Sequence, residues 1–104
     1  MPYRIYVSVE AELDLRYLRV TEQRRIRVAL AQHLAHEPTL VSNARKRLDP
    51  NPLNLVWELR LGPLRVFYEV EDAAKTVRVE RVGYKRGNDL YVRGQIVDLR
   101  GQTL

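Results

Sequence analysis

The first residues of the chain follow the pattern of a half-buried strand. Apolar and polar residues alternate over 3–9, which is the period of a β-strand with one buried face. The buried face is expected to carry Tyr3, Ile5, Val7 and Val9. The N-terminal segment therefore predicts one strand of a sheet.

Two helices are predicted after this strand. Apolar residues recur at helical spacing over 11–18, and the second helix is expected to begin after an N-cap at Thr21. Its inner stripe consists of Ile26, Leu30, His33 and Leu34. The helix should end at Glu37, because the residue before Pro38 is pushed out of helical geometry. These patterns predict a helical hairpin that turns at 19–21.

The second half of the chain has the pattern of an antiparallel meander. Residues 39–54 show no period and contain several turn-forming residues, so we expect an ordered connection there. Strand-like segments follow at 55–61, 64–71 and 76–83. The turns between them are short enough for hairpins. From Gly87 onward the sequence suits a final small hairpin or an extended tail.

Together these elements predict a single α+β domain over 1–104, with both helices on one face of a three- to four-stranded antiparallel sheet. On the first meander strand, every second residue from Leu55 onward should face the helices. The opposite face should be uncovered and should carry Glu58, Arg60, Arg65 and Phe67. The pattern thus gathers charged side chains and one aromatic ring on an open sheet face.

Composition adds an unusual charge. The chain has 18 Lys and Arg against 13 Asp and Glu, a formal net charge of +5, and only three of the cations are lysines. Arginine pairs bidentately with phosphate and stacks on bases, so the bias favours nucleic acid or an acidic protein as partner. The absence of cysteine excludes disulfides and thiolate metal sites, and no apolar run is long enough for a membrane span. We therefore expect a cytoplasmic protein with no membrane partner.

Three ordered pieces of the meander are similar to a known family. They are an aromatic-x-L-R strand at 57–60, an L-R-V-x-Y strand at 64–68 that runs on to an acidic turn, and V-G-x-K-R followed by a tyrosine over 82–91. In this order they resemble the C-terminal half of the RelE/ParE toxins of bacterial type II toxin–antitoxin systems. The strand–helix–helix start agrees as well, so the resemblance covers nearly the whole chain. It implies a small basic toxin that a cognate antitoxin neutralises.

The resemblance implies one of two activities. One branch of the family consists of endoribonucleases that cut messenger RNA on the ribosome and so inhibit translation, whereas the other branch poisons DNA gyrase. We expect the ribonuclease, with RNA and the ribosome as further partners. The alternatives are a gyrase inhibitor and a non-catalytic member that only binds its partner or nucleic acid. RNA cleavage without a metal or cofactor needs proton transfers and a group that stabilises the charge of the transition state.

The resemblance also supplies candidate catalytic residues. Arg65 matches the arginine that stabilises the transition state in the ribonuclease branch, and Arg60 matches a basic residue on the preceding strand. Lys85 corresponds to the basic position after V-G-x, and Tyr91 to a tyrosine that stacks on the substrate base or helps proton transfer. Glu58 stands where the best-known members have a lysine. It could act as general base, or it could pair with Arg60 or Arg65 and quench the site.

Other cations could bind the RNA backbone with a salt-dependent affinity. These candidates are Arg86 and the cluster Arg45, Lys46 and Arg47, with Arg24, Arg25 and Arg27 on the second helix. The alternatives are a solvated basic surface and a binding surface for an acidic antitoxin segment. A metal site is not expected, because His33 and His36 have no third ligand to complete a shell.

Overall fold

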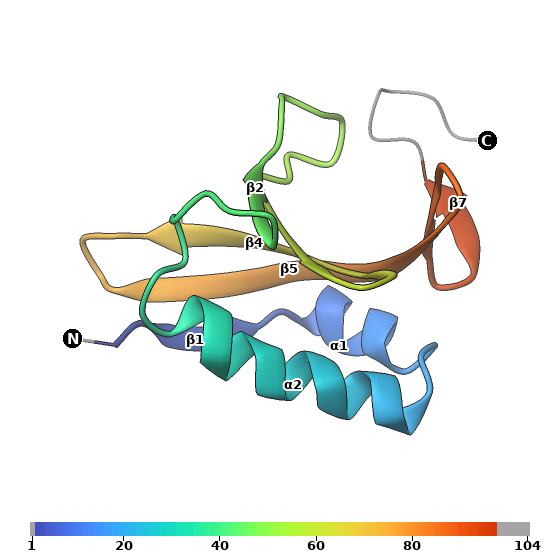
Figure 1. Ribbon diagram of the computed structural model, residues 1–104, viewed down its shortest axis with the longest axis horizontal. Helices are drawn as coiled ribbons and strands as arrows, with labels where there is room; N and C mark the ends of the chain where they lie inside the picture. Colours follow the sequence, from blue (N-terminus) through green and yellow to red (C-terminus); the bar gives the residue numbers. More distant parts are fainter. Residues whose placement is uncertain (1, 98–104) are drawn as a thin grey trace.

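The computed structural model describes residues 2–97, in which two helices pack against one face of a seven-stranded sheet (Figure 1). In chain order the elements are β1 (Arg4–Val7), α1 (Val9–Leu15), α2 (Val20–Leu34), β2 (Arg45–Arg47), β3 (Trp57–Leu61), β4 (Leu64–Glu71), β5 (Thr76–Arg86), β6 (Asp89–Val92) and β7 (Gln95–Val97). The expected α+β architecture is confirmed. The expected C-terminal hairpin is β6–β7, and the tail at 98–104 lies outside the described residues.

The sheet has more strands than expected, and β5 pairs with two strands, β1 and β6, along the same edge. The strand order is β2-β3-β4-β5-β6-β7, and β1 pairs with β5 in parallel. Val79 of β5 is the last residue paired with β1, and Tyr84 is the first paired with β6, while β4 runs along the other edge. A register shift between Phe67 and Tyr68 leaves Glu80 of β5 without a partner on β4, as in a β-bulge. The edge of β5 between β1 and β6 therefore lacks a neighbouring strand.

The helices begin at different residues from those expected. Ser8 caps α1 by accepting a hydrogen bond from the Ala11 backbone N–H at 3.0 Å, so the strand ends before Val9. The prediction that Val9 belongs to a buried strand face is wrong, since its side chain is 76% exposed. The N-cap of α2 is Arg19, whose backbone N–H donates to the Glu22 carboxylate, and the prediction of a Thr21 cap is also wrong.

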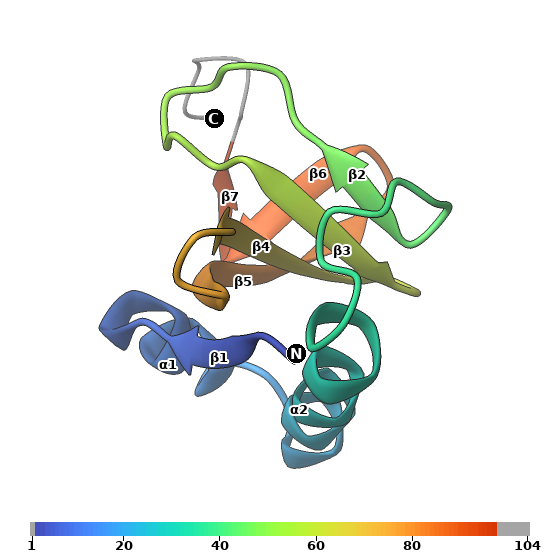
Figure 2. The ribbon, with the colours of Figure 1, turned by 90° about the vertical axis from the view of Figure 1, so that its left-hand side faces the viewer.

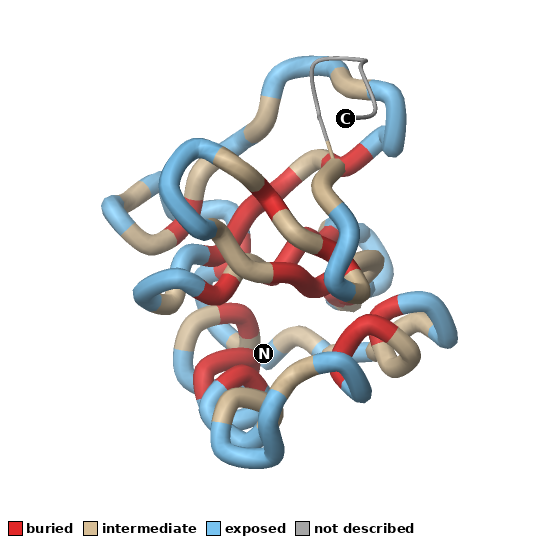
Figure 3. The backbone as a smooth tube through the Cα atoms, turned by 90° about the vertical axis from the view of Figure 1, so that its right-hand side faces the viewer, coloured by how far each residue is buried: buried red, intermediate tan, exposed pale blue. Residues whose placement is uncertain are grey.

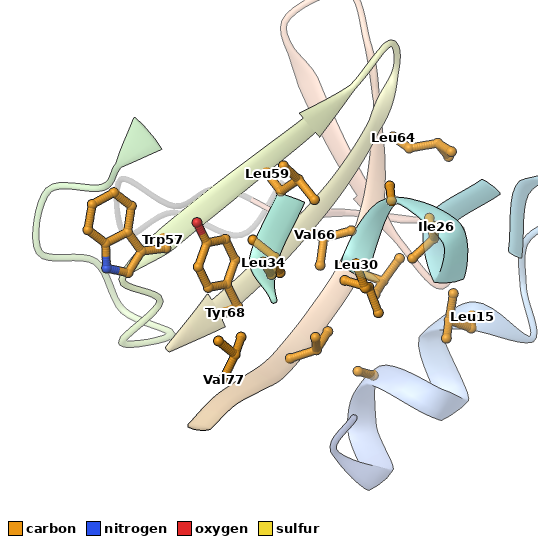
Figure 4. Packing of buried hydrophobic residues seen from close by; sticks show 14 residues of the cluster. Leu15, Ile26, Leu30, Leu34, Trp57, Leu59, Leu64, Val66, Tyr68 and Val77 are labelled. Atoms are coloured by element: carbon orange, nitrogen blue, oxygen red, sulfur yellow. The ribbon is translucent and has the colours of Figure 1, made fainter. Parts of the chain in front are cut away.

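The principal core fills the space between the helices and the sheet. Ile26, Leu30 and Leu34 of the expected α2 stripe are buried there, whereas His33 is only half-buried. Figure 4 shows these side chains meeting those of β3, β4 and β5, with Leu15 entering from α1. The alternation of apolar residues thus positions both helices on the sheet.

A second, smaller core covers part of the sheet face opposite the helices, which we call the far face. It consists of Leu55, Phe67, Leu90 and Val92, with Leu48 and Val97 packed against them. Phe67 is fully buried, so the prediction that it lies on an open face is wrong, as is the placement of Leu55 on the helix side. In Figure 3 the buried segments lie toward the middle of the molecule and the exposed segments along its outer turns. The far face is therefore closed where the β6–β7 hairpin and the connection before β3 meet it.

Gly83 lets β6 approach β5 closely. A Cβ atom at this position would lie 2.5 Å from the backbone oxygen of Tyr91, which is closer than any side-chain carbon can come to an oxygen. Sterics therefore require glycine at this position of the V-G-x-K-R segment, because any larger residue would push the C-terminal hairpin away.

A buried carboxylate joins α1 to the unpaired edge of β5. Asp14 is 1% exposed, and its Oδ2 accepts hydrogen bonds from the Val82 backbone N–H at 3.0 Å and from Arg81 Nε at 2.8 Å. Its Oδ1 accepts a bond from Arg93 Nε at 2.6 Å, and Arg93 also reaches the Glu10 carboxylate at 2.6 Å. The hydrogen bond to Asp14 raises the pKa of the Arg93 guanidinium. Helix α1, strand β5 and the β6–β7 turn thus meet at one carboxylate.

We expect Asp14→Ala to lower the free energy of unfolding by about 3–5 kcal/mol, since it leaves two arginines without their buried partner. Urea unfolding followed by circular dichroism measures this change. The matched control is Glu12→Ala, which removes an exposed pair with Arg27 and should cost less than about 1 kcal/mol. Equal losses in the two variants would show that the buried cluster has no special role.

Candidate active site

Two arginines face each other on the far face. In the register of β3 and β4, Arg60 is the direct partner of Arg65, and Arg65 is in turn the partner of Gly83 on β5. Like charges directly opposite each other destabilise a sheet. The pair therefore costs stability unless an anion binds between or above the two guanidinium groups.

Arg65 is held in place by backbone oxygens. Its Nη1 donates to the carbonyls of Gly62 at 2.5 Å and Leu64 at 2.9 Å, and its Nε is buried without a partner among the described residues. Burial lowers the pKa of the Arg65 guanidinium; the charge of Glu58 opposes this effect and that of Arg60 adds to it. The guanidinium remains cationic, because arginine keeps its proton in proteins. Nη2 has no hydrogen-bond partner among the described residues, so this fixed cation keeps donors that are suited to binding an oxyanion.

Glu58 forms an ion pair with Arg60. Its Oε1 lies 2.6 Å from Arg60 Nε, and the Glu58 side chain is 9% exposed whereas that of Arg60 is 41% exposed. Of the two roles considered for Glu58, pairing is therefore the one that the geometry supports. The bond occupies Nε of Arg60 and leaves its two Nη groups for another acceptor.

Lys85 extends the same surface along β5. It lies two residues beyond Gly83 and pairs with Leu90 of the second core, which places it on the far face. Its backbone N–H donates to Pro63 O at 2.7 Å, so the end of β5 lies beside the turn that holds Arg65. Arg86 follows at the exposed end of the strand. Lys85 therefore approaches the arginine pair more closely along the sheet than Arg86 does.

Tyr91 lies on the other face of the β5–β6 pair. Its ring stacks on that of its register partner Tyr84, with centroids 5.2 Å apart and an interplanar angle of 9°. Tyr84 packs against the principal core, and residues paired across a ladder share a face. The structure thus does not place Tyr91 beside Arg65, although the sequence analysis grouped them.

The basic cluster of the connection forms β2 and divides between the two faces. Arg45 is 8% exposed, and its guanidinium donates to Leu40 O at 2.9 Å and contacts His33 Nδ1 at 3.0 Å. Arg47 lies over the Trp57 ring, 5.8 Å from its centroid. Only Lys46, the register partner of Glu58, shares the face of Arg65. Internal contacts thus account for Arg45, which we leave out of the proposed substrate-binding set.

The backbone groups that position Arg65 leave no signal in the sequence. The Gly62-Pro63 pair predicts a turn, and Gly62 has a positive φ of 61°, but no pattern indicates that its carbonyl accepts a bond from an arginine.

In the described part of the chain, no three His, Asp or Glu side chains gather as a ligand set for a metal ion. Over the same residues no helix is long and apolar enough to cross a membrane.

Solved structures resemble this fold over most of its length, although neither a family model nor a curated protein matches the sequence. The RelBE2 toxin–antitoxin complex of Mycobacterium tuberculosis has a chain that is 27% identical, with a TM-score of 0.67 over 82% of this chain and 100% of that one. The archaeal RelE–RelB complex of Pyrococcus horikoshii matches at 25% identity and a TM-score of 0.64, over 84% of this chain and 98% of that one. A mutant of the E. coli toxin RelE in the free state is 22% identical with a TM-score of 0.62, over 81% and 84%, and supports the fold alone. Over about four-fifths of its length the chain is thus similar in fold and sequence to the toxin–antitoxin proteins RelBE2 and archaeal RelE–RelB.

Proposed function

We propose that this protein is the toxin of a type II toxin–antitoxin pair and that it cleaves messenger RNA on the ribosome without a metal or cofactor. The observation that carries the proposal is the facing pair of Arg60 and Arg65, with Nη1 of Arg65 fixed by two carbonyls and its Nη2 without a partner among the described residues. A cognate antitoxin as partner follows from the toxin–antitoxin complexes that the fold resembles. Action on the ribosome would place the protein in the cytoplasm.

The proposed chemistry assigns charge stabilisation to the arginines. When a 2′-hydroxyl attacks the adjacent phosphorus, a bond forms from the 2′-oxygen to phosphorus and the bond to the 5′-oxygen breaks. In the proposal solvent water takes the proton of the 2′-hydroxyl and returns one to the leaving 5′-oxygen. Negative charge accumulates on the phosphoryl oxygens in between, and a preorganised cation lowers the energy of that state most effectively. Arg65 serves this role in the proposal, while Arg60 and Lys85 bind the phosphate and Lys46 and Arg86 bind the flanking backbone.

Glu58 acts in this proposal as a positioning residue. Its carboxylate is nearly buried and already bonded to Arg60, so it directs the remaining donors of that arginine toward the far face. Four cations and one carboxylate then share this part of the face: Lys46, Arg60, Arg65, Lys85 and Glu58. The excess of positive charge survives the ion pair, which suits a polyanionic substrate.

Gyrase inhibition or binding without catalysis is the second candidate. It is favoured by one observation: among residues 2–97, Glu58 is the carboxylate nearest the arginine pair by register, and it is bonded to Arg60 rather than free to take a proton. Such a protein would use the same cations to bind a partner. Mapping of messenger RNA ends after induction separates the two candidates, because only the ribonuclease produces new ends.

Arg65→Ala should lower messenger RNA cleavage by about 100- to 1,000-fold, the loss typical of one donor to a developing oxyanion. Primer extension after a short induction in the absence of antitoxin measures the cut ends. The control is Arg16→Ala, an exposed arginine at the end of α1 whose loss should leave cleavage unchanged. Full toxicity of the Arg65→Ala protein would remove Arg65 from the mechanism.

Glu58→Gln tests positioning against general base catalysis. Glutamine keeps an oxygen that can accept the bond from Arg60 Nε, so we expect cleavage to stay within about threefold of the wild type. Loss of a general base would instead lower the rate by about 100-fold or more. Glu58→Ala removes the acceptor, and its loss of cleavage rate should lie between about threefold and about 100-fold. The readout is the single-turnover cleavage rate on programmed ribosomes.

Tyr91→Ala should lower stability rather than the cleavage rate of the folded protein. Removal of the stacked ring should cost about 1 kcal/mol beyond the lost burial, whereas the face that carries Arg65 is unchanged. Urea unfolding and the cleavage rate per folded molecule are measured together. A variant with normal stability and a large loss of cleavage would place Tyr91 in the active site after all.

A further inference from the structure

The turn between β3 and β4, which holds Arg65, lies beside helix α2. It consists of the pair Gly62-Pro63 between the two strands. Figure 2 shows β3 ending above α2, and a hollow of about 440 Å³ at this place is lined by Arg25 of the helix and Leu61 of the strand. The backbone that orients the proposed catalytic cation therefore has a side chain of α2 as its neighbour.

The central peptide of this turn has only one polar group that can anchor it. Gly62 has a φ of 61°, and Pro63 keeps φ near about −65°, which is the combination of a two-residue type II′ hairpin. Because proline has no N–H, the peptide between them offers only Gly62 O, which accepts the bond from Arg65 Nη1. The Lys85 backbone N–H holds the next carbonyl, Pro63 O, at 2.7 Å. The orientation of the Gly62 carbonyl thus depends on what packs against Gly62.

The guanidinium of Arg25 packs there. Its Nη2, Nη1 and Cζ atoms lie 3.1, 3.6 and 3.8 Å from the position that a Cβ atom on Gly62 would take, and they are the three atoms nearest to it. A planar group thus covers the glycine where a side chain would otherwise stand. Ile26, the next residue of the helix, is fully buried and fixes the backbone that carries Arg25. Among residues 2–97 Arg25 forms no ion pair that would draw it from the turn.

We propose that Arg25 is a positioning residue for Arg65: it packs on Gly62 and so fixes the carbonyl that orients the Arg65 guanidinium. If this carbonyl turned away, Arg65 Nη1 would lose one of its two acceptors and the cation would shift. A displacement of about 1 Å at a catalytic group lowers a rate by up to about 100-fold. That the positioned cation acts on RNA rests on the proposed function, whereas the contacts between Arg25, Gly62 and Arg65 do not.

A direct contact with RNA is the other role open to Arg25, and its place in the fold argues against it. The hollow beside Arg25 has an apolar lining of Val28, Ala29 and Leu61, and Leu61 packs against the principal core. Arg25 therefore lies on the helix side of the sheet, whereas Arg65 belongs to the far face. The two roles differ in kinetics, because a ligand of the RNA contributes to substrate binding and a positioning residue to the rate of the bound complex.

Arg25→Ala should lower the maximal single-turnover cleavage rate about tenfold and leave the half-saturating concentration of programmed ribosomes within about twofold. Rates are expressed per folded molecule, from urea unfolding of the same sample. The control Arg16→Ala removes the same charge from an exposed position at the end of α1 and should change neither quantity. A raised half-saturating concentration with an unchanged maximal rate would make Arg25 an RNA ligand and overturn the inference.

Gly62→Ala tests the same contact from the side of the turn. The new Cβ atom would displace the Arg25 guanidinium, which is the movable end of a long side chain. The maximal rate should fall at least as far as in Arg25→Ala, and adding Arg25→Ala to Gly62→Ala should lower it by less than about twofold more. Losses that multiply in the double variant would show that Arg25 and Gly62 act independently, and the inference would then fail.

A measurement without RNA separates this inference from the proposed function. Arg65 Nε is buried and has no partner among the described residues, and its proton–nitrogen resonance is assigned by its absence in Arg65→Lys. Arg25→Ala should shift this resonance and speed the exchange of its proton with water, whereas Arg16→Ala should do neither. An unchanged Arg65 resonance in Arg25→Ala would overturn the inference. A wild-type chain that cuts no messenger RNA, with the resonance shifted in Arg25→Ala, would refute the proposed function alone.

Discussion

The carboxylate of Asp14 is the constraint on which the arrangement of the sheet depends. It satisfies the Val82 backbone N–H at the gap between β1 and β6, and it binds two arginines, Arg81 of β5 and Arg93 of the β6–β7 turn. One buried group therefore holds α1 against the sheet edge and fixes where the C-terminal hairpin folds over. Because that hairpin closes the second core, the cluster also determines how much of the far face is left to the cations.

The candidate active site is assembled from features that a stable sheet would avoid. Arg60 stands directly opposite Arg65, and Arg65 buries a donor that has no partner among the described residues. Glu58 compensates for only one of these charges, and the carbonyls of the Gly62 turn hold the other. Such local conflicts between stability and charge are characteristic of functional sites, because the cost is offset when the ligand binds.

The alternation of apolar and polar residues predicted where strands lie. It did not predict which side chains are buried by segments distant in the sequence. The bounds of β4 follow from alternation alone, whereas Phe67 on the same strand alternates outward and is nevertheless buried by a hairpin 20 to 30 residues later. Arg45 likewise belongs to a basic run in the sequence, but its guanidinium is occupied by His33 and Leu40. The pairing of Glu58 with Arg60 was one of two alternatives, and only side-chain geometry favours it over a free base.

Ion pairing, rather than the number of arginines, distinguishes the surfaces that can bind a ligand. Among residues 2–97, six arginines have carboxylate partners: Arg19, Arg27, Arg60, Arg78, Arg81 and Arg93. Arg65 has none in the described chain and is fixed by backbone oxygens on the far face, while Arg24 and Arg25 border an apolar hollow on the helix side. The first setting suits a phosphate, because backbone oxygens hold the cation in a fixed position. The second lies beside the exposed side chain of Val28. The net charge of +5 therefore includes arginines in two chemically different settings on opposite sides of one sheet.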